Sequence, residues 1–485
     1  MTLPWIVRAP GAPYFMTETG EPWTPIGQND AINWLELNGL YRRRDLPGVR
    51  RHLRWLADHG VAVLRLMLEY TQNDHRYFEK PFGTWNASMV QLWDDLFALC
   101  DEAGLRILLT PNDTFFTWIR WHKHPWNEAN GGPCPSRTML LTHPGARAAM
   151  KARLQFATER WGGSGVLFAW DLYNEMHPSQ GEENAPHCFN DYINDVGPWL
   201  RTLETRLHGR AHLQCVSVFG PELEWKPWIV DPIFRNPNLD FASSHFYEEG
   251  TIDHPRDTVA PALAMAKLTV EALSHIGDGR PFVESEHGPI HTFKDKKKTL
   301  PEPFDDEYFR HMQWAHLASG GAGGGMRWPN RRPHKLTDGM RRAQRAMNAF
   351  LPLIDWLCFS REPLNSRLRA EGCANGSAHG AGGEDVAAFG CGDDRQAVVW
   401  LLRRGPLGRD GRLLPTPAPA TVDVPGLCSG SFTVTSFDTT AGTPGDSWAV
   451  ENNGGPLRLH VPPFRGDVAL AVRLQRPSRA SHENV

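Results

Sequence analysis

The chain has 485 residues, which is enough for a large α/β barrel with a smaller domain beside it. Its 51 basic and 55 acidic residues give a formal net charge of -4, which argues against a nucleic-acid partner, because nucleic-acid binding needs a clustered excess of basic charge. The eight cysteines contain no CxxC pair, so we expect buried, reduced thiols and neither a disulfide framework nor a zinc site.

Residues 1–20 lack a basic segment followed by an apolar run, and no stretch of the chain approaches about 18 consecutive apolar residues. We therefore expect neither a signal peptide nor a membrane span, and so a cytoplasmic protein, unless a leader has been trimmed from the sequence. The short basic run at 294–298 is broken by Asp295 and is expected to be a solvated loop.

Short apolar runs rich in β-branched residues alternate with longer helical patterns through roughly the first 355 residues, which predicts βαβ units and a parallel sheet. Eight strands are predicted, at residues 23–28, 61–68, 106–111, 167–173, 213–219, 239–246, 281–286 and 323–328. Helices are predicted at residues 49–59, 89–103, 146–161, 189–207, 258–276, 305–318 and 340–357, while the Pro-rich crossover at 227–235 is expected to hold only a short helix. This pattern predicts a (β/α)8 TIM barrel over residues 1–358.

The pattern changes beyond the barrel. Residues 371–384 are rich in Gly, Ala and Ser and predict a loop. The runs at 396–402, 420–424, 432–437, 457–461 and 468–474 are short and separated by turn signals, without helical periodicity. They predict a small C-terminal antiparallel β-sandwich over residues 359–475, followed by a polar tail at 476–485.

Two of the predicted strands end in glutamates. Glu175 follows the strand at 167–173, and Glu286 ends the strand at 281–286, just before Gly288. Strand alternation places Asp171, Tyr173 and Glu175 on one side, and Glu284 on the same face as Glu286 but deeper in the barrel, where it would need a charge partner. Barrel enzymes carry their active sites at the carboxyl ends of the strands, and two carboxylates facing each other across a sugar are what glycoside hydrolysis requires.

Three motifs give these glutamates a setting. Asn174-Glu175, His245-Phe246-Tyr247 and Glu286-His287-Gly288 each follow a strand, and together they resemble the clan A glycoside hydrolases, especially family 5, over roughly residues 5–357. The resemblance implies that Glu175 is the general acid/base and Glu286 the nucleophile. It also implies substrate or carboxylate contacts for Asn174 at the sugar 2-hydroxyl, Arg65 beside the nucleophile, His245, Tyr247 near Glu286, and Trp328 below the subsite that precedes the scissile bond.

The third strand departs from the family pattern. It ends in Thr110-Pro111-Asn112-Asp113, where many family members carry a histidine. We predict Asn112 and Asp113 as substrate contacts. His122 and His124 lie on a long aromatic loop at 114–135, and without a nearby acidic ligand they predict a substrate loop or a surface feature, not a metal site. The loop is expected either to form a binding wall or to pack against the barrel.

The expected activity is that of a retaining β-glycosidase that needs no cofactor or metal and acts on gluco-, manno- or galacto-type oligosaccharides or conjugates. The lack of a secretion signal favours exo over endo action. The pair of carboxylates is expected to raise the pKa of the acid, while Arg65 keeps that of Glu286 low. The alternatives are a non-catalytic carbohydrate-binding barrel, which the two glutamates and Arg65 disfavour, and a pentosidase such as an arabinofuranosidase. The C-terminal part resembles the β-domains that brace many bacterial glycosidases.

Overall fold

The computed structural model describes residues 3–71, 74–181, 187–220, 222–248, 251–290, 298–372, 386–414 and 416–475. Most of the predicted loop at 371–384, the basic run at 294–298 except its last residue, and the predicted tail at 476–485 lie outside the described residues.

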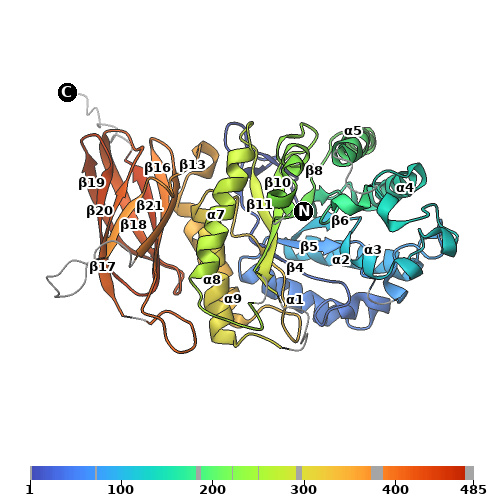
Figure 1. The fold of residues 1–485 in the computed structure, drawn as a ribbon, viewed down its shortest axis with the longest axis horizontal. Helices are drawn as coiled ribbons and strands as arrows, with labels where there is room; N and C mark the ends of the chain where they lie inside the picture. Colours follow the sequence, from blue (N-terminus) through green and yellow to red (C-terminus); the bar gives the residue numbers. More distant parts are fainter. Residues whose placement is uncertain are drawn as a thin grey trace, which may run out of the picture.

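Parallel strands close into a barrel, as the sequence predicted (Figure 1). The two outermost strands of the sheet order, β8 and β9, are separated in sequence by Val216 alone, so they occupy one position and complete the ring. The barrel strands are β4 (Gly27–Asn29), β5 (Val63–Met67), β6 (Arg106–Thr110), β7 (Leu167–Asp171), β8 (Leu213–Cys215), β9 (Ser217–Phe219), β10 (Ala242–Glu248), β11 (Phe282–Pro289) and β12 (Met326–Arg327).

The predicted first strand at 23–28 is divided between two sheets. Its end belongs to β4, whereas its start belongs to β3 of a small antiparallel sheet made of β1 (Ile6–Arg8), β2 (Phe15–Thr17) and β3 (Pro22–Trp23). The ring of Phe15 packs edge-on against Phe168 and Phe241, which lie where β7 and β10 begin. The small sheet therefore covers the amino-terminal end of the barrel, away from the carboxyl ends of the strands.

Helices cover the outside of the barrel, close to the predicted positions. They are α1 (Leu46–Asp58), α2 (Ala87–Ala103), α4 (Pro144–Trp161), α5 (Cys188–His208), α7 (Ala260–His275), α8 (Glu302–Ala318) and α9 (Asp338–Phe350). The fifth crossover has only the short turns α6 (Glu222–Trp225), η7 (Pro227–Ile229) and η8 (Asp231–Arg235), as its prolines predicted. Local chemistry sets the ends: the Asn86 side chain accepts from the Ser88 N–H at the start of α2, and Gly104, with φ of 77°, ends it.

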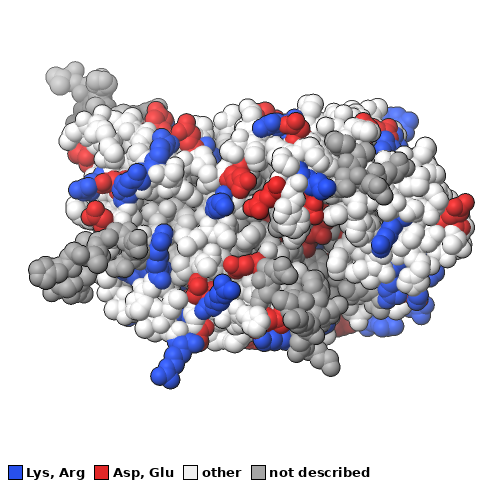
Figure 2. Space-filling view, in the orientation of Figure 1, with Lys and Arg blue, Asp and Glu red and all other residues white. Residues whose placement is uncertain are grey.

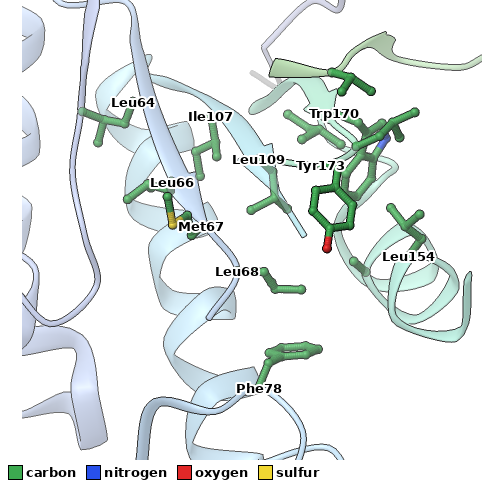
Figure 3. Close-up of a cluster of buried hydrophobic side chains, with 14 of the residues drawn as sticks. Leu64, Leu66, Met67, Leu68, Phe78, Ile107, Leu109, Leu154, Trp170 and Tyr173 are labelled. Carbon is green, nitrogen blue, oxygen red and sulfur yellow. The ribbon is translucent and has the colours of Figure 1, made fainter. Parts of the chain in front are cut away.

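Side chains of the barrel strands alternate between the interior and the helix layer. Arg65 of β5 points inward to side chains from other strands, whereas its neighbours Leu64 and Leu66 point outward. The outward set makes the cluster in Figure 3, which includes Leu64, Leu66, Ile107, Leu109, Leu154 and Trp170. Burial of these side chains holds the helices against the barrel. The inward side chains are not needed for this packing and can form polar contacts with one another.

Two antiparallel sheets follow the barrel, as predicted. One has the strand order β13-β15-β16-β21-β18-β19 and the other β14-β17-β20. Their strands are β13 (Glu362–Pro363), β14 (Arg369–Gly372), β15 (Val386–Gly392), β16 (Gln396–Arg403), β17 (Ala418–Val424), β18 (Gly430–Asp438), β19 (Thr443–Asn452), β20 (Leu457–Phe464) and β21 (Asp467–Leu474). The sequence did not predict β13, β14, β15 or β19. Most of β19 is exposed, so it lacks the apolar alternation that reveals a half-buried strand.

A buried carboxylate joins the barrel to the C-terminal sheets, where α8 and α9 lie between them (Figure 1). Asp467 of β21 accepts a hydrogen bond from Arg310 Nη2 of α8 at 3.0 Å and from Trp400 Nε1 of β16 at 3.0 Å. Although burial opposes it, the Arg310 guanidinium holds the pKa of Asp467 well below its usual range. Trp314, Phe350 and Phe437 pack beside this contact in one apolar cluster.

We expect Asp467→Asn to lower the free energy of unfolding by about 3 kcal/mol, because Arg310 would lose its counter-charge in a buried setting. The pKa of Asp467 is depressed on folding, so its stabilisation is complete above the unfolded pKa of about 3.9 and is lost as the pH falls. Urea unfolding should therefore separate wild type and variant at pH 7, and the difference should begin to narrow only below about pH 4 and close as the pH falls through the depressed folded pKa. Asp423→Asn, which breaks an exposed pair with Arg458, serves as control and should change little. Equal losses in the two variants would contradict a bracing role for Asp467.

None of the described helices combines the length and the apolar character needed to span a bilayer. On the face drawn in Figure 2, basic and acidic side chains are interspersed. The seven cysteines among the described residues are free, and five of them are buried, as expected for reduced thiols.

Candidate active site

Glu175 sits on a strained turn at the carboxyl end of the barrel. Strand β7 ends at Asp171, and Glu175 has φ of 45°, a left-handed conformation that non-glycine residues rarely adopt. Its N–H donates to Ser217 Oγ at 3.1 Å and its carbonyl accepts from Thr114 Oγ1 at 2.6 Å. Strain held by neighbouring strands is a frequent mark of functional residues. The prediction that Tyr173 and Glu175 lie on one side is wrong, because the strand ends before either residue. The ring of Tyr173 packs against Tyr192 of α5.

A β-bulge in β11 separates Glu284 from Glu286. Ser244 pairs with Glu284 but His245 pairs with Glu286, so Ser285 is an extra residue. The Ser244 hydroxyl donates to Glu284 Oε2 at 2.8 Å, on the opposite face of β10 from His245. The prediction that Glu284 and Glu286 share a face is therefore wrong. Burial raises the pKa of Glu284 well above its usual range and so favours its protonated form, and among the described residues no base forms an ion pair with it.

Arg65 is the centre of the inward-facing polar network, with 1% of its side chain exposed. Its Nη1 donates to Glu286 Oε2 at 2.7 Å and to Asn29 Oδ1 at 2.9 Å. Its Nη2 donates to Asp171 Oδ2 at 2.7 Å and to Asn174 Oδ1 at 2.5 Å. One guanidinium thus positions the nucleophile candidate against residues from two other strands or their ends, β4 and β7.

Asn29 at the end of β4 belongs to this network and was not predicted. Its Nδ2 donates to the carbonyls of Ser285 at 2.9 Å and Met326 at 3.1 Å, so it also ties together the seventh and eighth strand positions. The sequence offered only a single Asn at the end of a short strand, which is too common a pattern to single out. Asp171 was recognised as inward-facing, but its pairing with Arg65 came only from the fold.

The two glutamates face each other across a short gap that His245 bridges. A carboxylate oxygen of Glu175, one of Glu286 and a ring nitrogen of His245 all lie within 4.8 Å of one another. His245 Nδ1 is 2.9 Å from Glu175 Oε1 and 3.8 Å from Glu286 Oε2. The Tyr247 hydroxyl donates to Glu286 Oε1. Glu175 keeps 21% of its side chain exposed and Glu286 keeps 8%, so both can be reached from the open end of the barrel.

Burial dominates the proton affinities of this pair. It raises the pKa of Glu175 to about 7, against the opposing charges of Arg65 and His177. It also raises the pKa of Glu286 above the ordinary value, although His245 and Arg65 lower it. The expectation that Arg65 keeps the pKa of Glu286 low is therefore corrected: the loss of solvent outweighs the cation. Burial lowers the pKa of His245 to about 4, so its ring is neutral near pH 7.

Asn174 and Asp113 extend the network toward the third strand. Asn174 Nδ2 donates to Asp113 Oδ1 at 2.5 Å, and the other oxygen of Asp113 accepts from the Phe116 N–H at 2.6 Å. Burial raises the pKa of Asp113 to about 7. Asn112 is the one predicted site residue that lies apart, because its Nδ2 donates to the Leu172 carbonyl at 3.2 Å on the helix side of β7.

Aromatic side chains from four loops stand beside this network. Trp328 is partly exposed, and its ring centroid lies 4.9 Å from that of Trp34 in an edge-to-face contact. The ring centroids of Trp34 and Tyr70 are 6.0 Å apart, and those of Tyr70 and Phe116 are 4.4 Å apart. Trp34, Tyr70 and Phe116 were not predicted, since aromatic residues after strands are as often packed as functional. These contacts link Trp328, Trp34, Tyr70 and Phe116 into one continuous aromatic cluster.

The loop at 114–135 is held by buried charges. His124 is buried, with Nε2 3.3 Å from Glu69 Oε1, and Arg153 of α4 donates to the same oxygen at 3.0 Å. Although burial opposes it, Arg153 lowers the pKa of Glu69 to about 2. Trp126 is also buried and donates to Glu79 at 2.8 Å. His124 and Trp126 therefore anchor the loop, and the acidic partner that the sequence did not suggest comes from the end of β5.

Glu175, His245 and Glu286 are, within the described ranges, the one group with the spacing of metal ligands. Their atoms already have other partners: Arg65 and Tyr247 donate to the two oxygens of Glu286, and His245 lies against Glu175. A guanidinium in contact with a ligand oxygen disfavours a second cation there. The arrangement is suited to proton transfer between carboxyl groups and a bound molecule.

No protein-family model matches the chain, and no curated protein matches its sequence. Solved structures match its fold. A glycoside hydrolase family 5 protein from Bacteroides vulgatus ATCC 8482 has a TM-score of 0.60 at 12% identity, over 98% of this chain and 94% of that one. A protein described as a glycoside hydrolase has a TM-score of 0.58 at 12% identity, over 97% of each chain. A family 5 mannosidase from Rhizomucor miehei has a TM-score of 0.52 at 15% identity, over 72% of this chain and 97% of that one. The chain thus has the fold of these hydrolases.

Proposed function

We propose that the protein is a retaining glycoside hydrolase that cleaves β-linked glycosides. The observation that carries the proposal is the spacing of Glu175 and Glu286, whose nearest carboxylate oxygens lie within 4.8 Å. Retaining enzymes hold the two carboxyl groups about 5–5.5 Å apart, and inverting enzymes about 6.5–9.5 Å, because the latter must fit a water molecule between the sugar and the base. The spacing supports direct attack by one of the two carboxylates.

The surroundings of the two groups support their separate roles. Glu286 has both oxygens held by donors, Arg65 and Tyr247, which orient it as a nucleophile toward the anomeric carbon. Glu175 is the more exposed of the two and has a pKa of about 7, raised by burial, so it can carry the proton for the leaving oxygen. Glu286 forms the bond to the sugar as the leaving oxygen takes the proton of Glu175. Water then attacks the anomeric carbon while Glu175 accepts its proton, and the bond between that carbon and Glu286 breaks to release the carboxylate.

For the substrate, we propose β-linked hexosides with β-mannosides tested first, since one structure of similar fold is described as a mannosidase. Asn174, Asp113 and Trp328 are the proposed contacts of the sugar bound beside Glu286. We further propose exo action, because the loop at 114–135 is fixed near the strand ends by Glu69 and Arg153 and can act as a rigid wall. Product analysis with a tetrasaccharide tests this: exo action releases a monosaccharide from the first minutes.

The test of the reaction is a panel of aryl β-glycosides and disaccharides, with proton NMR of the first-formed anomer. The proposal expects a β-anomer from a β-glycoside. An α-anomer would overturn the retaining mechanism. If no member of the panel is cleaved but some bind in calorimetry, a non-catalytic sugar-binding barrel becomes the better account.

The pH dependence should show a falling limb near neutrality. Burial raises the pKa of Glu175 to about 7, and only the protonated form can act as an acid, so kcat/KM for a poorly activated glycoside should fall above about pH 7. For a dinitrophenyl glycoside, whose leaving group needs no proton, this limb should be absent, and Glu175→Gln should lower kcat/KM strongly only for the poorly activated glycoside. A wild-type rate that stays constant from pH 6 to pH 9 would contradict the assignment of Glu175.

A further inference from the structure

A chain of hydrogen bonds runs from Glu175 into the wall of the barrel. Glu175 Oε1 lies 2.9 Å from His245 Nδ1, and His245 Nε2 lies 3.1 Å from Ser285 Oγ. Ser285 Oγ lies 2.6 Å from Ser243 Oγ. His245, Ser285 and Ser243 are fully buried. The bulge in β11 creates this chain, because it adds Ser285 to the residues that face His245.

The direction of donation along these hydrogen bonds follows from what the groups at the two ends can donate and accept. A neutral imidazole has one N–H and one acceptor nitrogen, so its two contacts have opposite sense. If the donors run toward Glu175, Ser243 donates to Ser285, Ser285 to Nε2, and Nδ1–H to Oε1. If they run the other way, the Ser243 hydroxyl must donate elsewhere, and among the described residues Ser285 is its one hydrogen-bond partner. A buried donor without an acceptor is costly, so the first direction is favoured.

We propose that Ser285, supported by Ser243, is a positioning residue that fixes His245 in the tautomer with its proton on Nδ1, and thereby keeps the catalytic proton of Glu175 on Oε2. In this tautomer Oε1 is an acceptor and cannot hold the proton. Oε2 has no partner among the described residues, so it is the oxygen left for the leaving group. The proposal rests on the proposed function in assigning the acid to Glu175.

Other charged and polar groups affect the proton affinity of Glu175 and His245, and they do so in both tautomers. Substitution of Ser285 therefore changes the tautomer preference without removing any of these groups. They come from five strands and the loops that follow them: Arg65, Asp113, Asp171, His177, Tyr247 and Glu286. Burial holds the pKa of His245 at about 4, so the ring stays neutral over the working range and only its tautomer can change.

Loss of the Ser285 hydroxyl removes the donor to Nε2. Nε2 then has no partner in either tautomer, so the preference for a proton on Nδ1 that the two hydroxyls impose is weakened. In molecules with the proton on Nε2, Nδ1 accepts a proton from Oε1, on the far side from the leaving group. We expect Ser285→Ala to lower kcat/KM several-fold for alkyl glycosides and disaccharides, part of the gain that a general acid supplies. For dinitrophenyl glycosides, which leave without a proton, kcat/KM should change less than twofold. Ser285→Thr, which keeps a hydroxyl, should restore the difference.

The matched control is Ser244→Ala. Ser244 is the neighbour of His245 on β10, but it faces Glu284 on the other side of the strand. Its loss should leave the ratio of rates on activated and unactivated substrates unchanged.

The tautomer is measured directly by nitrogen NMR of protein labelled with 15N-histidine, with the His245 signals assigned by their loss in His245→Asn. Wild type, Ser285→Thr and Ser244→Ala should show a protonated Nδ1 and a bare Nε2, whereas Ser285→Ala should show a mixture of the two tautomers. A protonated Nε2 in wild type would overturn the proposal, and so would unchanged leaving-group dependence in a folded Ser285→Ala. If that variant does not fold, the wild-type spectrum alone decides, because it shows which ring nitrogen carries the proton. The NMR result stands even if wild type cleaves no glycoside, so failure of the proposed function is recognised separately.

Discussion

Glu286→Gln should reduce hydrolysis of every substrate by at least about 10⁴-fold, the scale seen when a residue of a catalytic unit is removed. The amide has nearly the shape of the carboxylate, so Arg65 and Tyr247 can still pack around it, but it cannot form the bond to the anomeric carbon. Substrate affinity, measured by calorimetry, should change far less than kcat. A folded Glu286→Gln that keeps more than a few per cent of wild-type kcat would rule out Glu286 as nucleophile.

The chain contains a matched control two residues away. Glu284 is a buried acid whose raised pKa favours the protonated form, and it accepts from Ser244 and faces away from Arg65. Glu284→Gln keeps the shape and charge of that form, so its kcat should stay within a few-fold of wild type. Chemical rescue sharpens the test further. In Glu286→Ala, added azide should attack the vacated side of the sugar and give a glycosyl azide of inverted configuration, which retention by wild type requires.

Arg65→Met is the second change with a large expected effect. It leaves Glu286 and Asp171 buried without their counter-charge, and the loss of one partner from a buried ion pair costs about 3–5 kcal/mol of unfolding free energy. Arg65 lowers the pKa of Glu286 in the wild type, so its removal raises that pKa further. A group whose folded pKa is raised opposes folding above that pKa, so the deficit should be larger at pH 8 than at pH 5.

Denaturant unfolding at the two pH values measures this effect, and kcat/KM reports the loss of positioning at the site. Arg50→Met is the control, since Arg50 forms an exposed pair with Glu102 and its loss should change stability little at either pH. A deficit in Arg65→Met that is the same at pH 5 and pH 8 would mean that lost packing, not uncompensated charge, is responsible.

Local patterns in the chain predicted the barrel and pointed to the two glutamates of the proposed site, for identifiable reasons. Inner strands are buried on both faces and read as apolar runs, helices begin and end at residues such as Asn86 and Gly104, and the carboxyl ends of all the strands meet at one edge. Glu175 and Glu286 follow from that last rule, together with Asn174. The same rule placed both Asn112 and Asp113 at the site. Adjacent residues at a strand end face opposite sides, so only Asp113 turns inward.

The sequence by itself therefore determined the class of fold, most of the outward and inward sides of the strands, and the positions of Glu175 and Glu286 near the carboxyl ends of their strands. Only the tertiary structure decided how those groups are held. The bulge at Ser285, the link from Asn29 to the seventh and eighth strand positions, and the pairing of His124 with Glu69 join residues from distant parts of the chain. Helical periodicity and capping depend on residues a few positions away along the chain, so a local stretch of sequence is enough to predict them. Strand register and charge pairing depend on what the barrel brings alongside once it closes, and no local pattern contains that information.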